Sequence, residues 1–322
     1  MPRDAGTRLR EKFHSPGVTL LPGGFSPVIA RMLDQLGFDG MFMAGSQTNI
    51  YEFAMPDVGL ITLREMVDAA RRITAASNLP VFMDGDTGYG NVLNVYRTVQ
   101  EAAWAGVACL SLEDQEAPKK SGTSAGRRCI SLEEAIGKLK DAVAARDEAE
   151  SDMMICARTD LIGGQTPDGK AGSFEAAVER CIAFVEEGGA DVVWINTVDS
   201  FDQMREACST IPGPVIPLYG GAPPAPNLDE WVQIGASAVL FPSLTTTTGL
   251  QATWELLNDF KERGLEAIRD AGRRAQASKW GAVSPQSLLY PNAAKILQME
   301  ADYLPQEQQR DYESTWGHPT QS

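Results

Sequence analysis

Short apolar runs recur along the chain, and each ends in small or polar residues. These runs cover residues 18–24, 39–46, 79–86, 107–114, 153–160, 190–197, 214–221 and 236–243. Because they are continuously apolar, they are typical of strands buried on both faces of a parallel sheet. Between them, apolar residues at three- and four-residue spacing predict helices over 27–37, 62–77, 94–106, 132–150, 174–189 and 227–235. Several of these helices end in a glycine at the expected cap position: Gly37, Gly106, Gly188 and Gly235.

Eight strands that alternate with helices predict an α/β fold, the parallel (β/α)8 or TIM barrel. A doubly wound open sheet is the alternative, but the count of eight and the lack of a GxGxxG after the first run weigh against it. After residue 250 the strand pattern stops, and helical patterns follow at 251–264 and 265–280. We therefore expect a barrel over residues 1–250 and, over 251–322, a helical extension and tail of the same domain. These extra helices must pack outside the barrel or on another subunit.

Charge and cysteine usage narrow the class of protein. The 322 residues carry a formal net charge of −15, which argues against nucleic acid or an anionic membrane as a partner. An anionic substrate would therefore need a local basic group or a metal. The five cysteines form no CxxC pair, which favours free thiols in a reducing compartment. With no apolar signal core near the N-terminus and no run of membrane-spanning length, we expect a cytoplasmic protein.

Polar side chains gather at the ends of the predicted strands, where the chemistry of such a barrel takes place. They are Gly45-Ser46, Asp84, Asp86, Glu113-Asp114, Arg158, Asp160, Asn196 and Tyr219. Asp84, Asp86 and Glu113 offer hard oxygen ligands without His or Cys, which favours Mg²⁺ or Mn²⁺ over Zn²⁺. Arg158 offers a fork suited to a substrate carboxylate, and a structural ion pair with Asp160 is equally open.

The stretch MDGDTGYGN (83–91) places two carboxylates at a strand end and follows them with a glycine-rich turn. A polar turn of this composition is common, but buried carboxylates are costly unless they are paired or bind a cation. Tyr89 in this turn is a candidate proton donor and could equally be a packing residue. The only histidines, His14 and His318, lie near the ends of the chain, so we expect no histidine base in the barrel.

The chain resembles the isocitrate lyase / phosphoenolpyruvate mutase superfamily. The similarity rests on MDGDTGYGN (83–91), SLEDQEAPKK (111–120) and ICARTD (155–160), with support from MPDVGLIT (55–62) and 188–196. The resemblance implies a (β/α)8 barrel, Mg²⁺, a 2-oxo or 2-hydroxy carboxylate substrate and an enolate intermediate. It also implies a last helix exchanged between subunits of a homotetramer or dimer of dimers.

The resemblance also implies residue roles. Asp84 would be the direct metal ligand, and Asp86 and Glu113 would hold metal-bound waters. Arg158 would bind the substrate carboxylate, and Asp57 would lie beside metal and substrate. Backbone N–H groups near Gly45 and Ser46 would receive substrate oxygens. We expect Asn196 and Tyr219 to add to the substrate pocket.

One loop departs from the family pattern. The lyases that cleave tricarboxylates carry a sequence close to KKCGH, where the Cys protonates the departing enolate. Here residues 119–123 read KKSGT, so Ser121 stands in the Cys position. A Ser hydroxyl is a far weaker acid. The similarity is therefore to an oxaloacetate decarboxylase or methylisocitrate lyase-like branch without the catalytic Cys.

We expect a Mg²⁺-dependent carbon–carbon lyase or decarboxylase of a 2-oxo or 2-hydroxy carboxylate such as oxaloacetate. Hydrolytic and retro-aldol-type cleavage remain open. Two alternatives are a phosphonopyruvate-type carbon–phosphorus hydrolase or mutase, and a metabolite-binding barrel that has lost turnover. The lack of an Asn in the 119–128 loop weighs against the first alternative. The retained acidic cluster weighs against the second, because repelling acids are costly to keep without a cation.

Overall fold

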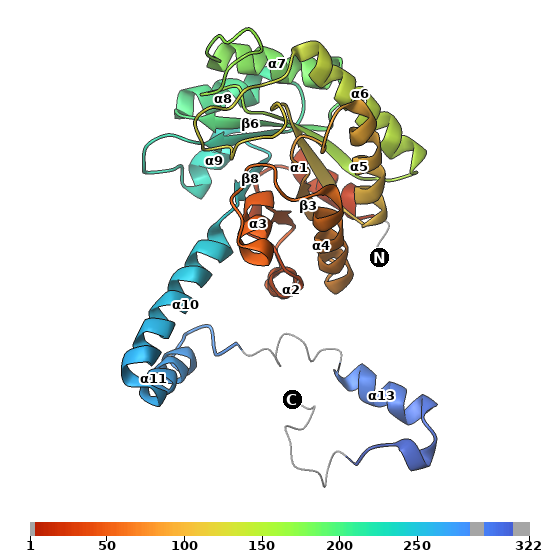
Figure 1. The fold of residues 1–322 in the computed structure, drawn as a ribbon, viewed down its shortest axis with the longest axis vertical. Coiled ribbons are helices and arrows are strands. Elements are labelled where there is room, and N and C mark those ends of the chain that lie inside the picture. The colour runs from red at the N-terminus through yellow and green to blue at the C-terminus, as the bar shows by residue number, and fades with distance from the viewer. Residues whose placement is uncertain (1–3, 284–292, 312–322) are drawn as a thin grey trace. The chain divides into compact units, whose positions relative to one another are not determined.

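In the computed structural model, eight parallel strands form one sheet and helices lie around it (Figure 1). The structure describes residues 4–283 and 293–311. The strand order is β7-β6-β5-β4-β3-β2-β1-β8. The strands are β1 (Thr19–Gly24), β2 (Met41–Met43), β3 (Val81–Asp84), β4 (Cys109–Glu113), β5 (Met154–Thr159), β6 (Val192–Val198), β7 (Val215–Tyr219) and β8 (Ala238–Phe241).

The two edges of this sheet approach one another. β8 pairs with β1, and the Ser237 N–H just before β8 donates to the Val215 carbonyl of β7 at 3.0 Å. The sheet is therefore a nearly closed TIM barrel, and the predicted (β/α)8 fold is confirmed. The open doubly wound sheet is excluded.

Side chains on alternate strand positions build two apolar layers. One layer fills the barrel and includes Phe42 packed edge-on against both Phe82 and Trp194, with ring centroids 5.4 and 5.5 Å apart. Leu9 and Phe13 of α1 belong to the same cluster. The other layer lies between strands and helices, as a continuously apolar strand requires. Both faces of the strands are buried, which is why the sequence shows runs without alternation.

Nine helices in the described part of the chain precede β8. They are α1 (Ala5–His14), α2 (Pro27–Gln35), α3 (Gly45–Phe53), α4 (Leu63–Ala76), α5 (Val92–Trp104), α6 (Leu132–Glu148), α7 (Phe174–Glu186), α8 (Phe201–Thr210) and α9 (Leu228–Ile234). Capping boxes begin α4 at Thr62 and α9 at Asn227, so local sequence fixes these starts.

The sequence pattern missed three helices and misplaced two boundaries. The helices α1, α3 and α8 are short and carry few apolar residues, so their periodicity is weak. The predicted strand 39–46 is wrong at its end, because Gly45 and Ser46 begin α3. The predicted cap at Gly188 is off by one residue, since Gly189 carries the positive φ of 75°. Gly37, Gly106 and Gly235 have positive φ as expected.

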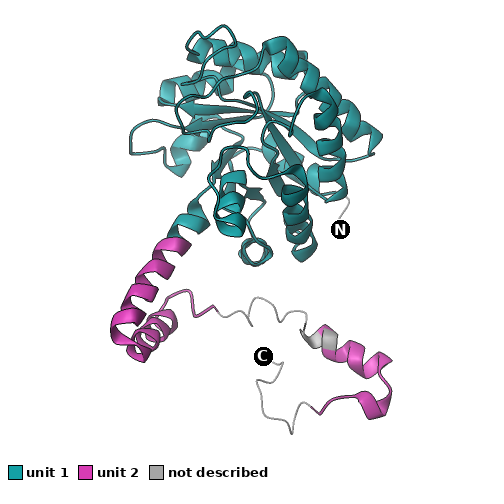
Figure 2. Ribbon diagram, in the orientation of Figure 1, with its two compact units in different colours: residues 1–248 teal, residues 249–322 magenta. Residues whose placement is uncertain are grey.

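The chain divides into two compact units, residues 1–248 and 249–322 (Figure 2). Helix α10 (Leu244–Arg263) begins in the first unit and ends in the second, where α11 (Leu265–Gln276), α13 (Ala293–Tyr303) and the 3-10 turn η2 (Gln306–Gln308) follow. Strands are absent from the described residues after β8, as predicted. Whether this extension folds as part of the barrel domain stays a prediction. Among the described residues, no helix is both long and apolar enough to cross a membrane.

Candidate functional site

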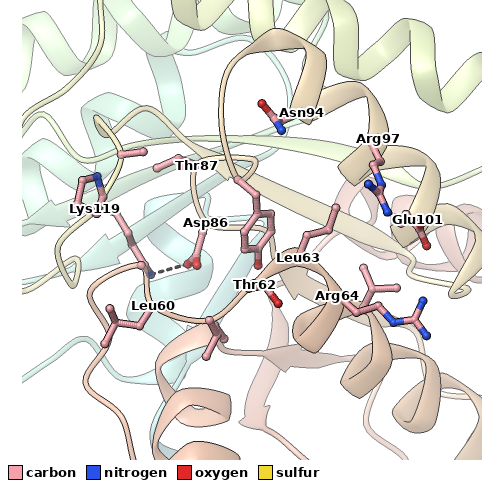
Figure 3. Close-up of a pocket in the computed structure, with 16 residues that line it drawn as sticks. Leu60, Thr62, Leu63, Arg64, Asp86, Thr87, Asn94, Arg97, Glu101 and Lys119 are labelled. Carbon is pink, nitrogen blue, oxygen red and sulfur yellow. Dashed lines mark ion pairs between the residues drawn. The ribbon is translucent and has the colours of Figure 1, made fainter.

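Two cavities of similar size open at the carboxyl ends of the strands. The first has a volume of about 630 Å³, and the second about 610 Å³. Seven residues expected at the site line the first cavity: Ser46, Asp57, Asp84, Ser121, Arg158, Asn196 and Tyr219. Asp86 and Tyr89 line the second cavity, together with Lys119 (Figure 3). We name the first the substrate cavity and the second the side cavity.

A buried lysine lies between the two cavities. The Lys119 ammonium forms ion pairs with Asp57 Oδ1 at 2.7 Å and with Asp86 Oδ1 at 2.5 Å (Figure 3 shows the second pair). Its side chain is only 3% exposed. Asp57 faces the substrate cavity and Asp86 the side cavity, so the pairs join the walls of both.

The carboxylates around Lys119 repel one another. Burial raises the pKa of Asp86 from 3.8 to about 6, because Lys119 only partly offsets burial and the charge of Asp84. Burial likewise raises the pKa of Glu113 well above its usual value, against the opposing effect of Arg158 and Lys119. Burial alone would lower the pKa of Lys119, but Asp86 and the other acids raise it well above its ordinary value. The cluster therefore carries an excess of negative charge that a bound cation would relieve.

The donor set of this cluster fits a hard divalent cation. Among the described residues, no three His, Cys, Asp or Glu side chains converge closely enough to hold a metal by themselves. A site with one direct carboxylate and several waters does not require that convergence. Asp84 can bind a metal ion directly, because each of its carboxylate oxygens accepts only one long hydrogen bond. The donors are the Gly45 and Asp86 N–H groups, both at 3.2 Å.

Gly45 is held tightly against these acids. A Cβ at this position would lie 3.1 Å from Asp84 Oδ2 and 3.3 Å from Asp86 Oδ1. The Gly45 N–H, which we expected to meet substrate oxygens, is engaged by Asp84. Ser46 lies beside it on the wall of the substrate cavity.

Arg158 lies in the substrate cavity inside a dense ionic network. It pairs with Glu113 Oε2 at 3.1 Å and with Asp160 Oδ2 at 2.8 Å, and its guanidinium lies 4.3 Å from the centre of the Trp194 ring. Both interpretations of Arg158 thus have support, because a structural ion pair with Asp160 exists on a residue that also lines the cavity. The Asn196 amide donates to Asp160 Oδ1 at 2.6 Å and holds that carboxylate toward Arg158.

The 119–128 loop lies against this network. Asn196 Nδ2 donates to the Gly122 carbonyl at 2.9 Å, and Arg127 donates to the same oxygen. A Cβ at Gly122 would lie 2.3 Å from Arg158 Nη2, so only glycine allows this approach. Ser121 and Thr123 on either side line the substrate cavity. In this structure, the loop therefore covers the Arg158 end of the cavity.

The turn after β3 is conformationally strained. Asp86 and Tyr89 have positive φ values of 48° and 59°, which cost a side chain roughly 1–2 kcal/mol each. The Tyr89 hydroxyl is buried and has no hydrogen-bond partner in the described part of the chain. Burial and the neighbouring acids, Asp86 first among them, raise its pKa well above 10, so it stays protonated. Its ring also packs against the apolar layer between strands and helices, and the proton-donor role of Tyr89 stays a prediction.

Lys119 is the site residue that sequence reasoning undervalued. In the sequence, Lys119, Lys120, Arg127 and Arg128 are typical of a basic loop that is either solvated or turned toward an anion. Lys119 and Arg127 are buried, while Lys120 and Arg128 are exposed or half-exposed. Nothing in the local sequence distinguishes Lys119 from Lys120, because the two acids that bury it come from distant segments.

Comparison with known proteins assigns the chain to a family. The family model for phosphoenolpyruvate phosphomutase matches residues 9–260. The chain belongs to this family. The phosphoenolpyruvate mutase / isocitrate lyase superfamily is thereby confirmed, whereas the absence of a catalytic Cys remains an inference from the sequence alone.

Two lyases are similar to this chain in sequence. 2,3-Dimethylmalate lyase of Eubacterium barkeri is 34% identical over 289 residues, covering 83% of this chain and 96% of the relative. 2-Methylisocitrate lyase of Aeropyrum pernix is 34% identical over 263 residues, covering 81% of each chain. Oxaloacetate acetylhydrolase, solved with 3,3-difluorooxalacetate, matches with a TM-score of 0.79 at 26% identity, covering 94% of this chain and 97% of that one. The prediction of an enzyme of the carbon–carbon lyase group is confirmed at this level.

Proposed function

We propose that this protein is a Mg²⁺-dependent carbon–carbon lyase or decarboxylase of a 2-oxo or 2-hydroxy carboxylate of the oxaloacetate type. The observation that carries the proposal is the meeting of Asp84 and Arg158 in one cavity, with Asp86 and Glu113 close behind. The relatives named above act on dimethylmalate, methylisocitrate and oxaloacetate, which supports a carboxylate substrate. Mn²⁺ would serve the same donor set.

The charged groups have separate tasks in this scheme. Asp84 would hold the metal directly, and Asp86 and Glu113 would hold its waters. The bound cation supplies positive charge that stabilises an enolate. Arg158 binds and orients the substrate carboxylate, and Asn196 keeps Asp160 in place beside it. Closure of the loop at Gly122 excludes water from this end of the cavity.

The reaction requires one bond to break and one proton to arrive. In a 2-hydroxy acid the hydroxyl would give its proton to Asp57, the carboxylate that lines the cavity beside Asp84, while the C2–C3 bond breaks, a carbonyl forms at C2 and the electron pair moves to C3. In a decarboxylation CO2 leaves and the electron pair remains at C3. In either case C3 then accepts a proton.

The proton donor need not be Ser121. Ser121 lines the cavity, but an unactivated hydroxyl is too weak an acid for this step. Lys119 and Tyr89 both hold their protons at neutral pH, since their pKa values are raised well above the ordinary ones. We propose that Lys119 protonates the enolate, because Asp57 on the wall of the substrate cavity holds its ammonium at 2.7 Å. Tyr89, on the wall of the side cavity, is the second candidate.

The decisive assay follows substrate loss with and without Mg²⁺. Oxaloacetate, 2,3-dimethylmalate, 2-methylisocitrate and phosphonopyruvate are tested in parallel, beside an Asp84→Ala variant. Asp168→Ala, an exposed carboxylate on a loop, is the matched control. We expect Mg²⁺-dependent formation of a 2-oxo acid, lost by a factor of about 10²–10³ or more in Asp84→Ala and kept in the control.

The outcomes separate the candidates. Turnover of phosphonopyruvate alone would replace the lyase with carbon–phosphorus chemistry. Mg²⁺ binding without turnover of any compound would favour a binding-only barrel. Equal activity of Asp84→Ala and wild type would refute the metal role of Asp84.

Two further expectations belong to this proposal. We propose a homo-oligomer, a tetramer or dimer of dimers, because α10 and α11 carry exposed apolar side chains. We also propose a cytoplasmic location, on the basis of the free cysteines.

A further inference from the structure

The rim of the substrate cavity is divided into a charged and an apolar sector. The strands β3 and β5 contribute Asp84 and Arg158, and Glu113 of β4 pairs with Arg158. Across the barrel, β7, β8 and the start of α10 contribute a wall without charged side chains. Its apolar members, which we name the apolar sector, are Leu218, Leu240, Phe241, Pro242 and Leu244, and Tyr219 and Ser243 lie among them. Strand order places these sectors on opposite sides, because β7, β8 and β1 lie across a nearly closed eight-stranded barrel from β3 to β5.

We infer that the substrate carries a hydrocarbon substituent at C3 in place of a third carboxylate, and that the apolar sector selects for it. The inference rests on the proposed function, because the head of the substrate must be held between Asp84 and Arg158. A substrate anchored there extends away from the charged strands. Its far end then meets the side chains of β7 and β8.

The described residues of the cavity include no uncommitted Lys or Arg side chain that could pair with another substrate carboxylate. Arg158 is the sole Lys or Arg among the described residues that line it, beside the acids Asp57 and Asp84. Arg158 already pairs with Glu113 and Asp160. Of the nearby loop cations, Lys119 is held by Asp57 and Asp86, and Arg127 donates to two carbonyl oxygens and to Asp160. An additional carboxylate at the far end would be desolvated without a partner, which is strongly unfavourable.

The apolar sector is held in place by backbone contacts. A Cβ at Gly23 of β1 would lie 1.9 Å from the Pro242 carbonyl oxygen, so the two segments are in direct backbone contact. Thr245 Oγ1 donates to the Gly23 carbonyl at 2.8 Å, and the Tyr51 hydroxyl donates to the Thr246 carbonyl at 2.9 Å. A wall fixed in this way discriminates by shape and polarity, since it does not readily rearrange around a charged group.

The test compares 2-hydroxy diacids that differ only at C3. Compounds with methyl or ethyl at C3 are assayed with Mg²⁺ against the compound with carboxymethyl at C3, as kcat/KM. We expect the alkyl compounds to be favoured at least about 100-fold. Equal or faster cleavage of the carboxymethyl compound would overturn the inference while leaving the proposed function intact.

A substitution at Phe241 tests whether the apolar sector sets the preference for alkyl over carboxymethyl substituents at C3. Its side chain is partly exposed, so a long polar side chain can be accommodated there. We expect Phe241→Arg to narrow the preference at least about tenfold by raising kcat/KM for the carboxymethyl compound, and Phe241→Leu to retain the wild-type preference. If both variants keep the wild-type ratio, Phe241 does not determine specificity.

A binding measurement keeps the inference testable if no compound is cleaved. Calorimetry with Mg²⁺ then compares unreactive analogues that lack the 2-hydroxyl. Tighter binding of the alkyl analogue supports the apolar sector even though the proposed function has failed. Equal or weaker binding of that analogue refutes the apolar sector as well.

Discussion

At the scale of single residues, the site is defined by charges that the fold forces into contact. Lys119, Asp57 and Asp86 come from separate segments and are buried together at 2.5–2.7 Å. Removing Lys119 would leave Asp57 and Asp86 as buried unpaired charges, which is more damaging than the loss of the pairs themselves.

Lys119 and its neighbour Lys120 provide a direct comparison. We expect Lys119→Met to lower the free energy of unfolding by about 3–5 kcal/mol and to abolish turnover, because two buried carboxylates lose their partner. Lys120→Met should change stability by less than about 0.5 kcal/mol, since Lys120 is exposed. Urea unfolding and steady-state kinetics on both variants check this, and similar losses in the two would contradict the central place given to Lys119.

The ionisation of Asp86 makes stability depend on pH. Its pKa is about 6 in the folded protein and about 3.8 in the unfolded chain. The folded state therefore binds more protons between these values, and stability falls as pH rises from 3.8 through 6. In the presence of a chelator, we expect Asp86→Asn to be more stable than wild type at pH 7.5 by up to about 3 kcal/mol.

The advantage of Asp86→Asn should shrink as the pH is lowered toward 4, where wild-type Asp86 is itself neutral. Urea unfolding at several pH values measures the difference. An advantage that is independent of pH would show that Asp86 does not titrate in this window. Turnover should be lost in this variant at every pH, which separates stability from function.

At the scale of elements, two loops bring chemistry to the barrel. The turn after β3 is fixed by positive φ values at Asp86, Gly88 and Tyr89. The loop after β4 depends on a glycine that lies against Arg158. Both depart from ordinary loop geometry where the active groups are placed, which is typical of sites that need preorganisation.

Substitutions at Gly122 and Gly126 test whether the 119–128 loop must lie against Arg158. A methyl group at Gly122 would meet Arg158 Nη2 at 2.3 Å, whereas a methyl group at Gly126 meets nothing within 4 Å. We expect Gly122→Ala to lower kcat/KM by at least about 100-fold through misplacement of the loop and of Arg158. Gly126→Ala carries only the backbone cost of its positive φ and should keep most of the activity.

Steady-state kinetics and thermal unfolding of the two variants measure this effect. A Gly122→Ala enzyme as active as Gly126→Ala would show that the loop need not lie against Arg158 during turnover.

At the scale of the whole molecule, the helical extension carries apolar surface beyond what the barrel requires. Trp254 and Leu257 of α10 are 67% and 58% exposed and lie three residues apart, on one face of the helix. A patch of this kind commonly marks an interface. The acidic chain, with its net charge of −15, makes non-specific aggregation through this patch less favourable than a defined assembly.

We therefore expect the wild-type protein to sediment as a tetramer, and Trp254→Asp with Leu257→Asp to dissociate it, because two charges would be buried at the interface. Glu262→Asp on the same helix is the control and should leave the assembly unchanged. Sedimentation velocity at micromolar protein checks this. A monomeric wild type would refute the oligomer.

Local pattern was sufficient for much of this protein. The continuous apolar runs predicted all eight strands, and their polar ends placed Asp84, Glu113, Arg158 and Asn196 at one rim. This succeeds because a parallel barrel repeats one local unit, and its carboxyl ends share a face. The short helices α1, α3 and α8 were not predicted, because they lack a regular apolar face that the sequence would show. Their stability comes mainly from tertiary packing.

The sequence by itself determined the fold, the acidic and basic groups of the rim and the class of chemistry they allow. Only the tertiary structure decided that Lys119 is buried and Lys120 exposed, that Gly122 lies against Arg158, and that an apolar sector faces the charged strands. Burial and ion pairing depend on which distant segments meet. No local pattern of residues encodes that meeting, whereas secondary structure and strand ends follow from neighbours along the chain.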